Sequence, residues 1–130
     1  MSEEQAIRDA MDAWSERGVD GLLELVVPDV EWHAPPGFME GEVWHGRDAV
    51  APVLREQFDS VFRMVRLELA EMVQGPRGWL IGGRVFASHD SGMNLDWTSY
   101  AVAQFERDLV KRIWVFVDRE SAARQAGLEA

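Results

Sequence analysis

The most restrictive feature of this sequence is a change of side-chain period in its second half. Within residues 63–73, Val65, Leu67 and Leu69 fall on one side of the chain and Arg66 on the other. A period of two is typical of β-strands, and short turns join strands that lie antiparallel and adjacent. Four strand-like segments follow one another with short turns between them, the last being apolar on both faces: residues 63–73, 79–88, 94–106 and 110–117. The pattern predicts a four-stranded antiparallel meander.

The first half of the chain shows helical spacing instead. Ser2 and Gln5 match a capping box, in which each side chain binds a free backbone N–H of the first helical turn. Gly18 is a typical helix end. Asp20 is placed to cap a second, shorter helix, which Pro28 is expected to end. The residues that form the apolar face of the first helix are Ile7, Ala10, Met11 and Trp14.

A strand and a third helix complete the first half. Residues 30–33 alternate like a strand, which Pro35-Pro36-Gly37 should break, and residues 42–45 are expected to form a short partner strand. Pro52 has no N–H and is expected in the first turn of the third helix, which makes Asp48 the expected N-cap.

These elements predict an α+β protein. The open face of a meander needs a cover, and the three expected helices supply it. A length of 130 residues fits a single domain, 1–130, that buries enough surface to fold without a disulfide or a metal. We therefore expect a mostly antiparallel sheet packed on about three helices.

Charge and composition exclude several classes of partner. The 13 Lys and Arg residues against 23 Asp and Glu give a net charge of −10, which repels nucleic acids and anionic membranes. Cysteine is absent, so thiol chemistry and thiolate metal sites are excluded. The three histidines have no metal-site spacing, and we expect neither a metal nor an organic cofactor. The acidic start of the chain and the lack of a long apolar run favour a cytoplasmic protein without a membrane segment.

Several short motifs in this order resemble those of one protein family. They are Pro28-Asp29-Val30-Glu31-Trp32-His33 with the prolines after it, Gly46-Arg47-Asp48-Ala49-Val50, Ser91-Gly92, Phe116-Val117-Asp118-Arg119 and Ala126-Gly127-Leu128. Together they resemble the SnoaL-like branch of the nuclear-transport-factor-2-like superfamily. The resemblance implies a cone-shaped half-barrel, in which a strongly curved sheet leaves a pocket between its concave face and the helices. It also implies a homodimer formed through the outer sheet face, to which Thr98, Tyr100, Val102 and Gln104 are assigned.

The chemistries known in this superfamily can be compared with the residues present. Ketosteroid isomerases use a carboxylate base with a tyrosine and a protonated aspartic acid, and the matching positions here resemble Trp32, Trp14 and Ala101. Neither Trp32 nor Ala101 can replace the carboxyl group expected at its position, so we reject that mechanism.

Limonene-epoxide hydrolases in the same superfamily activate water with two aspartates bridged by an arginine. Arg84 resembles the arginine and Asp118 one aspartate, but Phe86 occupies the position of the second. SnoaL-type cyclases need an acid or base for aldol closure, and His33, Glu31 or Asp118 is the candidate here. The candidate catalytic residues are therefore His33, Asp118 and Arg84.

Aromatic residues supply the candidate ligand contacts. Trp32, Phe86, Trp97, Trp114 and Phe116 are all assigned to the pocket face. One interpretation is a cage for an apolar ligand, and the other is that these rings fill the core. The small residues beside them leave room for a ligand. With Trp14, the expected ligand-binding set is Trp14, Trp32, Phe86, Trp97, Ser99, Ala101, Trp114 and Phe116.

For two charged candidates, Arg84 and Asp118, a structural role is the alternative to a functional one. An inward Arg84 needs a carboxylate, which Asp118 or Glu68 would supply, and the pair would either orient a ligand or stabilise the fold. Asp118 is also placed to cap a short helix from Glu120. Three functions follow: an acid–base enzyme acting on a hydrophobic or polyketide-like molecule, a non-catalytic binder of such a molecule, or a structural dimerisation module. The side chains of His33 and Asp118 discriminate between the first two, because catalysis requires one of them to point into the pocket.

Overall fold

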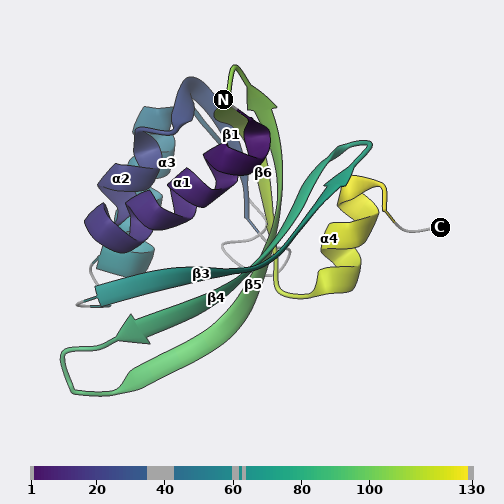
Figure 1. The fold of residues 1–130 in the computed structure, drawn as a ribbon. Coiled ribbons are helices and arrows are strands. Elements are labelled where there is room, and N and C mark those ends of the chain that lie inside the picture. Colours follow the sequence, from purple (N-terminus) through teal and green to yellow (C-terminus); the bar gives the residue numbers. More distant parts are fainter. Residues whose placement is uncertain (1, 35–42, 60–61, 63, 129–130) are drawn as a thin grey trace.

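The computed structural model describes residues 2–34, 43–59, 62 and 64–128 (Figure 1). The elements follow in the order α1 (Glu3–Arg17), α2 (Val19–Leu23), β1 (Val26–His33), β2 (Val43–His45), α3 (Arg47–Leu54), the π-helical turn η2 (Arg55–Asp59), β3 (Met64–Gly75), β4 (Gly78–Ser88), β5 (Asn94–Glu106), β6 (Leu109–Phe116) and α4 (Arg119–Ala126). The expected break at Pro35-Pro36-Gly37 and the first residue of the expected partner strand, Glu42, lie outside the described residues.

The described strands form one curved, unclosed sheet in the order β2-β1-β6-β5-β4-β3. The predicted antiparallel meander is confirmed as β3 to β6. β1 joins the meander parallel to β6, and β2 pairs antiparallel with β1. The predicted α+β fold, a strongly curved and mostly antiparallel sheet packed on helices, is thereby confirmed.

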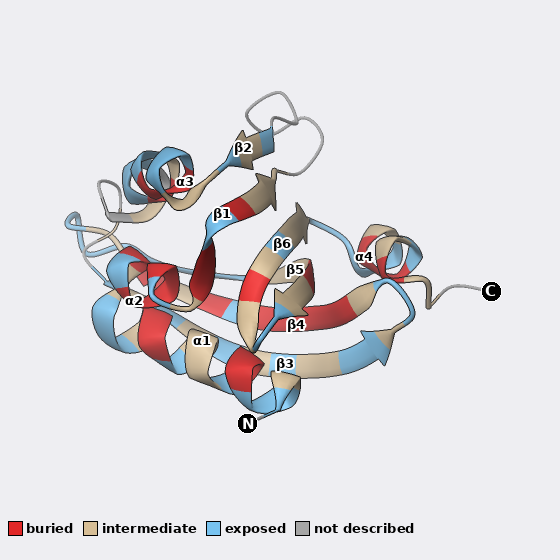
Figure 2. Cartoon of the chain, turned by 90° about the horizontal axis from the view of Figure 1, so that it is seen from above, coloured by how far each residue is buried: buried red, intermediate tan, exposed pale blue. Residues whose placement is uncertain are grey.

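The helices lie on both sides of the sheet. In Figure 1, α1, α2 and α3 lie on one side of the sheet and α4 on the other. The inner core joins α1, α2 and α3 to β1 around Trp14, Val30 and Leu54. A separate outer core packs α4 against β4 and β5, and Figure 2 shows buried stretches on α4 and β4. The buried members of this outer core are Leu80, Val102, Ala122 and Ala126. The sheet therefore carries a core on each face.

The ends of α1 follow the predicted signals. The Ser2 hydroxyl oxygen accepts the Gln5 backbone N–H at 3.1 Å, and Gly18, with φ 67°, donates its N–H to the Trp14 carbonyl at 2.7 Å. The second half of the capping box is absent, because the Gln5 amide donates to Asp9 at 2.9 Å instead. These hydrogen bonds set where α1 begins and ends, and Trp14 on its apolar face packs into the inner core.

The expected second helix is too long by several residues. α2 ends at Leu23, and Val26 and Pro28 belong to β1. Sheet pairing overrides the helical spacing here, because the Val110 N–H donates to the Leu25 carbonyl at 2.9 Å and Val26 pairs with Val110. The missing N–H of Pro28 is tolerated because the β1–β6 register shifts between Val26 and Glu31.

The prediction that Asp48 caps the third helix is wrong. α3 begins at Arg47 after Gly46, whose carbonyl accepts the Ala49 and Val50 N–H groups at 3.1 and 3.0 Å. Pro52 therefore lies inside the helix rather than in its first turn. The helix loses one backbone hydrogen bond at this point.

The outer sheet face is less open than expected. Val102, assigned above to a dimer surface, is fully buried under α4, and Tyr100 packs against the same outer core. Asp118 caps α4, and the Arg119 guanidinium bonds Glu71 on β3 at 2.7 and 3.1 Å. Because α4 is fastened to the sheet in this way, Val102 is unavailable to a partner subunit.

Candidate functional site

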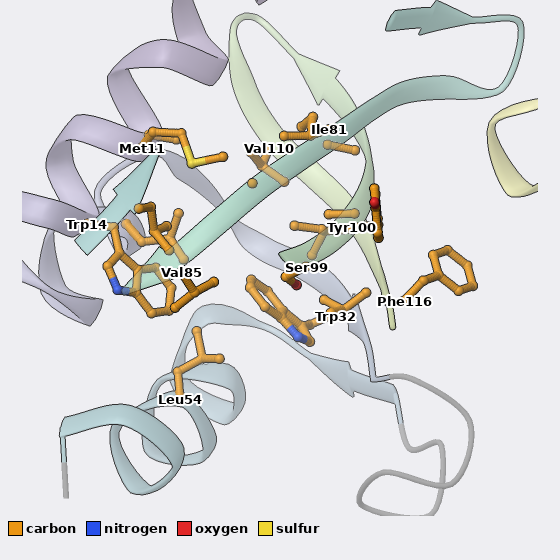
Figure 3. A pocket seen from close by; sticks show the side chains of 18 of the residues that line it. Met11, Trp14, Trp32, Leu54, Ile81, Val85, Ser99, Tyr100, Val110 and Phe116 are labelled. Carbon is orange, nitrogen blue, oxygen red and sulfur yellow. The ribbon is translucent and has the colours of Figure 1, made fainter. Parts of the chain in front are cut away.

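A cavity of about 600 Å³ lies between the concave sheet face and the helices α1, α2 and α3 (Figure 3). Its walls come from every described helix and strand except α4. The residues that line it include Trp14, Trp32, Trp44, Trp97, Ser99 and Tyr100. A volume of this size falls within the range of small-molecule sites.

The hollow follows from small residues in register on the inner face. Gly83 on β4 lies opposite Ser99 on β5, and Ala101 and Ala103 continue the same face of β5. A methyl group added at Gly83 would approach the end of Met11 on α1 at 3.1 Å. Larger side chains at these positions would fill the space between the sheet and α1.

Aromatic rings from separate elements form much of the wall. Trp14 on α1 packs edge to face on Phe58 of η2, with ring centroids 5.0 Å apart, and is 6 % exposed. Trp97 on β5 is 37 % exposed, with its ring centroid 6.1 Å from that of Phe62. Trp14 is thus largely a core residue, whereas Trp97 offers much of its ring to a ligand.

The polar content of the described lining is small and almost uncharged. Thr98, Ser99 and Tyr100 are the hydroxyl-bearing residues of the described lining, and Tyr100 is its single ionisable residue. Strand alternation directs Ser99 toward the cavity, whereas Thr98 and Tyr100 have the outward position and Tyr100 packs against the outer core. Ser99 lies on the inner face, and its hydroxyl makes no hydrogen bond to any described residue. An unpaired hydroxyl in an apolar wall favours a ligand that carries a hydrogen-bonding oxygen.

His33 lies outside this lining. Alternation along β1 places Trp32 on the inner face and His33 on the outer face, where His33 is in register with Trp114 of β6. Its Nε2 is 2.5 Å from Glu31 Oε1, and its ring stacks on Trp114 with centroids 5.0 Å apart. The expectation that His33 acts inside the pocket is therefore not supported by its position.

Asp118 performs the alternative role considered for it. Its carboxylate accepts the Ser121 backbone N–H at 2.8 Å and the Ser121 hydroxyl at 3.0 Å at the start of α4. The backbone hydrogen bond from Ser121, followed by that from its hydroxyl, lowers the pKa of Asp118 below its ordinary value. Asp118 is exposed and is absent from the described lining.

Arg84 is also on the outer face, and neither expected partner binds it. Its guanidinium bonds Asp96 of β5 at 2.8 Å, and both side chains are about half exposed. Phe86 lies on the same face, with the guanidinium carbons of Arg66 and Arg84 at 4.6 and 5.7 Å from its ring centroid. The assignment of Phe86 to the pocket face is wrong, because side chains alternate along β4 and that of Phe86 falls on the face turned away from the cavity.

Trp114 is the second aromatic residue assigned to the wrong face. It packs between His33 and the outer core under α4. Alternation along β6 places Ile113 and Val115 toward the cavity instead. Phe116, at the end of the strand, contacts both the cavity and the outer core.

The remaining expected contacts do line the cavity: Trp14, Trp32, Trp97, Ser99 and Ala101. Sequence reasoning missed Trp44, which β2 places opposite Trp32. It also missed the wall formed by Phe58, Val53 and Leu54. The apolar stripe on the third helix carries the signal for Phe58, but a stripe that faces a cavity looks the same in sequence as one that faces a core.

Comparison with known proteins identifies the family. The family described as SnoaL-like domain matches residues 7–113. This chain belongs to the SnoaL-like family. No curated protein matches this SnoaL-like chain.

Solved structures similar to this SnoaL-like domain support its fold. An NTF2-like protein of unknown function from Burkholderia pseudomallei has a TM-score of 0.74 at 22 % identity, covering 97 % of this chain and 98 % of that one. TerC, co-crystallised with polyporic acid, has a TM-score of 0.74 at 18 % identity, covering 95 % and 97 %. Rv0760c from Mycobacterium tuberculosis, in complex with estradiol-17beta-hemisuccinate, has a TM-score of 0.69 at 14 % identity, covering 88 % and 93 %. At these identities the likeness concerns the fold.

Two features are absent from the described residues. No helix within them combines the length and apolar character needed to cross a membrane. No three of their His, Asp or Glu side chains come together as a group that would hold a metal ion.

Proposed function

We propose that this SnoaL-like protein binds a neutral, ring-containing and largely apolar small molecule without acid–base catalysis by His33 or Asp118. The observation that carries the proposal is the cavity of about 600 Å³, whose described lining is aromatic and aliphatic with Tyr100 as its single ionisable residue. His33 and Asp118 both lie elsewhere, so general acid–base chemistry lacks the groups assigned to it. Turnover of a pocket ligand that depends on either residue would contradict this proposal.

The charge of the ligand follows from the same lining. A carboxylate in this cavity would lose its hydration without gaining a cationic partner among the described lining residues, and the net charge of −10 would oppose its approach. A neutral hydroxyl or carbonyl needs one hydrogen bond, which the free Ser99 hydroxyl offers. We therefore expect selectivity for a neutral oxygen-bearing ring system over its carboxylate.

A matched series of pyrene derivatives tests this selectivity. Pyrene, 1-pyrenemethanol and 1-pyrenecarboxylate share one ring system and differ in a single substituent, and energy transfer from tryptophan reports their binding. We expect 1-pyrenemethanol to bind best and the carboxylate at least about tenfold more weakly, which corresponds to roughly 1.4 kcal/mol. Equal binding of the carboxylate, or no binding of any member, would refute the proposal.

Ser99→Ala tests the assigned hydrogen bond. One lost hydrogen bond of about 0.5–1.5 kcal/mol predicts a two- to tenfold weaker affinity for 1-pyrenemethanol. The affinity for pyrene, which has no oxygen, should stay unchanged. Ser91→Ala, in the exposed turn after β4, is the matched control and should change neither affinity.

We also propose that the protein is a cytoplasmic homodimer that associates through the uncovered part of its outer sheet face. The exposed Thr98 and the half-buried Phe86 belong to that part, whereas Val102 is covered by α4. The absence of cysteine supports a reducing compartment.

A further inference from the structure

The middle of α1 faces the sheet at a position that has no side chain. Met11 and Gly83 both line the cavity, and a methyl group added at Gly83 would lie 3.1 Å from the Met11 Cε atom. The end of the Met11 side chain therefore occupies the space that a larger residue at Gly83 would fill. Figure 3 shows this side chain projecting from α1 into the cavity. A long, unbranched side chain of the helix thus lies over the smallest residue of the facing strand.

Hydrogen bonds hold α1 to the sheet on either side of Met11. Near the start of the helix, the Trp79 indole N–H donates to Glu3 Oε1 at 2.9 Å. Near its end, the Leu67 backbone N–H donates to Ser15 Oγ at 3.0 Å, and the Ser15 hydroxyl donates to the Leu67 carbonyl at 3.3 Å. These contacts set the distance between α1 and the sheet, so the shape of the cavity near Met11 changes through side chains rather than through the helix.

Met11 is free to change its shape. It is half-buried, whereas Ile7, one helical turn before it, is 1 % exposed. Methionine has several rotatable side-chain bonds and no branch, so it adopts different rotamers at low cost and is common at surfaces that accept different ligands. Gly83 offers no side chain that would hold the Met11 methyl group in one place. Met11 and Gly83 together form an adjustable floor of the cavity.

The surroundings of this adjustable floor are aliphatic. Met11 packs against a buried cluster that includes Ile7 and Ile81, and both of these residues line the cavity. A ligand group that replaced the Met11 methyl group over Gly83 would therefore meet apolar side chains. Ser99 lies opposite Gly83 in the register of β4 and β5, so a ligand oxygen bound to Ser99 would lie at the edge of the same floor.

We propose that Met11 is a specificity-determining residue, which moves off Gly83 to admit a short aliphatic arm on the ring system of the ligand. This inference deepens the proposed binding function and rests on it for the class of ligand. The adjustable floor itself is a property of the unliganded protein. The arm and the Met11 methyl group compete for one space over Gly83. A substitution that fills or empties this space therefore changes the preference of the pocket for ligands with an arm.

Pyrene and 1-butylpyrene test the arm, because they share one ring system and neither carries an oxygen for Ser99. Each buried methylene group contributes roughly fourfold in affinity. The wild type should therefore bind 1-butylpyrene at least about fourfold more tightly than pyrene, as measured by energy transfer from tryptophan. Gly83→Ala fills part of the space and should lower this preference about fourfold. Met11→Ala empties the space and should raise the preference by a similar factor.

Gly82→Ala is the matched control, because the same methyl group at the neighbouring position would point to the outer face, toward Glu71 and Tyr100. It should keep the wild-type preference. Equal binding of pyrene and 1-butylpyrene by the wild type, or a preference that Gly83→Ala or Met11→Ala leaves unchanged, would overturn the proposal. Because these two variants should move the preference in opposite directions, each tests the proposal even if the other does not fold.

NMR of the methionine methyl groups separates this inference from the proposed function. In the unliganded wild type, the Met11 ε-methyl group should exchange between rotamers, and Gly83→Ala should move its signal while Gly82→Ala leaves it in place. 1-Butylpyrene should move the same signal more than pyrene does. If neither pyrene binds but Met11 exchanges between rotamers, the proposed function fails and the adjustable floor stands. A single Met11 rotamer with and without 1-butylpyrene would overturn the adjustable floor, whatever binds.

Discussion

The contrast between Trp14 and Trp97 decides whether the aromatic rings form a ligand wall or simply a core. Trp14 is 6 % exposed and Trp97 is 37 % exposed, although both line the cavity. The perturbation is alanine substitution at each position in turn. If the rings only fill the core, each alanine substitution should lower stability in proportion to the burial of the ring and should leave ligand affinity unchanged.

The stability difference can be worked from burial. Complete burial of a tryptophan side chain removes about 150–250 Å² from water, worth about 4–6 kcal/mol at 25 cal/mol per Å². Trp97 keeps over a third of its surface exposed, so Trp97→Ala should lose about 2 kcal/mol less unfolding free energy than Trp14→Ala. Trp14→Ala should itself cost about 3–5 kcal/mol, which a domain of about 5–15 kcal/mol can survive.

The binding difference should run the other way. The exposed ring of Trp97 is available to stack on a ligand, and such a contact is worth about 0.5–1.5 kcal/mol beyond area burial, or roughly two- to tenfold in affinity. Trp97→Ala should therefore weaken 1-pyrenemethanol binding while the domain remains folded.

Urea unfolding followed by far-ultraviolet circular dichroism measures stability without relying on the removed tryptophan, and pyrene emission measures affinity. Trp97→Phe is the matched control, because it keeps an aromatic ring and should retain most of the affinity. Equal destabilisation by the two alanine variants, together with unchanged binding in Trp97→Ala, would refute the ligand-wall reasoning.

Two other predictions concern the outer face. Asp118→Ala should lower the thermal stability of the protein without changing 1-pyrenemethanol affinity, because Asp118 caps α4 and lies outside the described lining. Because the pKa of Asp118 is lowered in the folded state, its carboxylate stabilises the protein above the ordinary carboxyl titration range, and this stabilisation is lost as pH falls through the lowered pKa. A difference in melting temperature between the wild type and Asp118→Ala that persists at the lowest pH would contradict this. The proposed homodimer should appear as twice the chain mass in sedimentation equilibrium, with Phe86→Ser weakening it, and a monomer mass at every concentration would rule it out.

The sequence by itself determined the alternating meander, since a period of two with short turns permits few other arrangements. It also determined the ends of α1, because Ser2 and Gly18 act through local backbone hydrogen bonds. The cap at Asp118 is equally local, and the sequence contained that alternative in plain form. The family was readable as well, since its motifs lie in order along the chain.

The direction of side chains at strand ends was decided by tertiary pairing. His33 faces outward because its parallel register with Trp114 continues the alternation of β1 past Trp32. Phe86 and Trp114 were assigned inward because they are large and aromatic, but a helix and two arginines cover them on the other face. The type of a residue shows that it tends to be buried, whereas its position in the alternation along the strand decides on which face of the sheet it is buried.

The cavity itself was also a tertiary outcome. Trp32 and Trp44 share the wall through pairing between β1 and β2, and Ser99 is free because Gly83 lies opposite it. No local sequence pattern predicts these contacts, because each depends on the distance between the curved sheet and α1. The chain alone showed which rings and small residues were available, and the curvature of the sheet decided which of them surround a hollow and which fill a core.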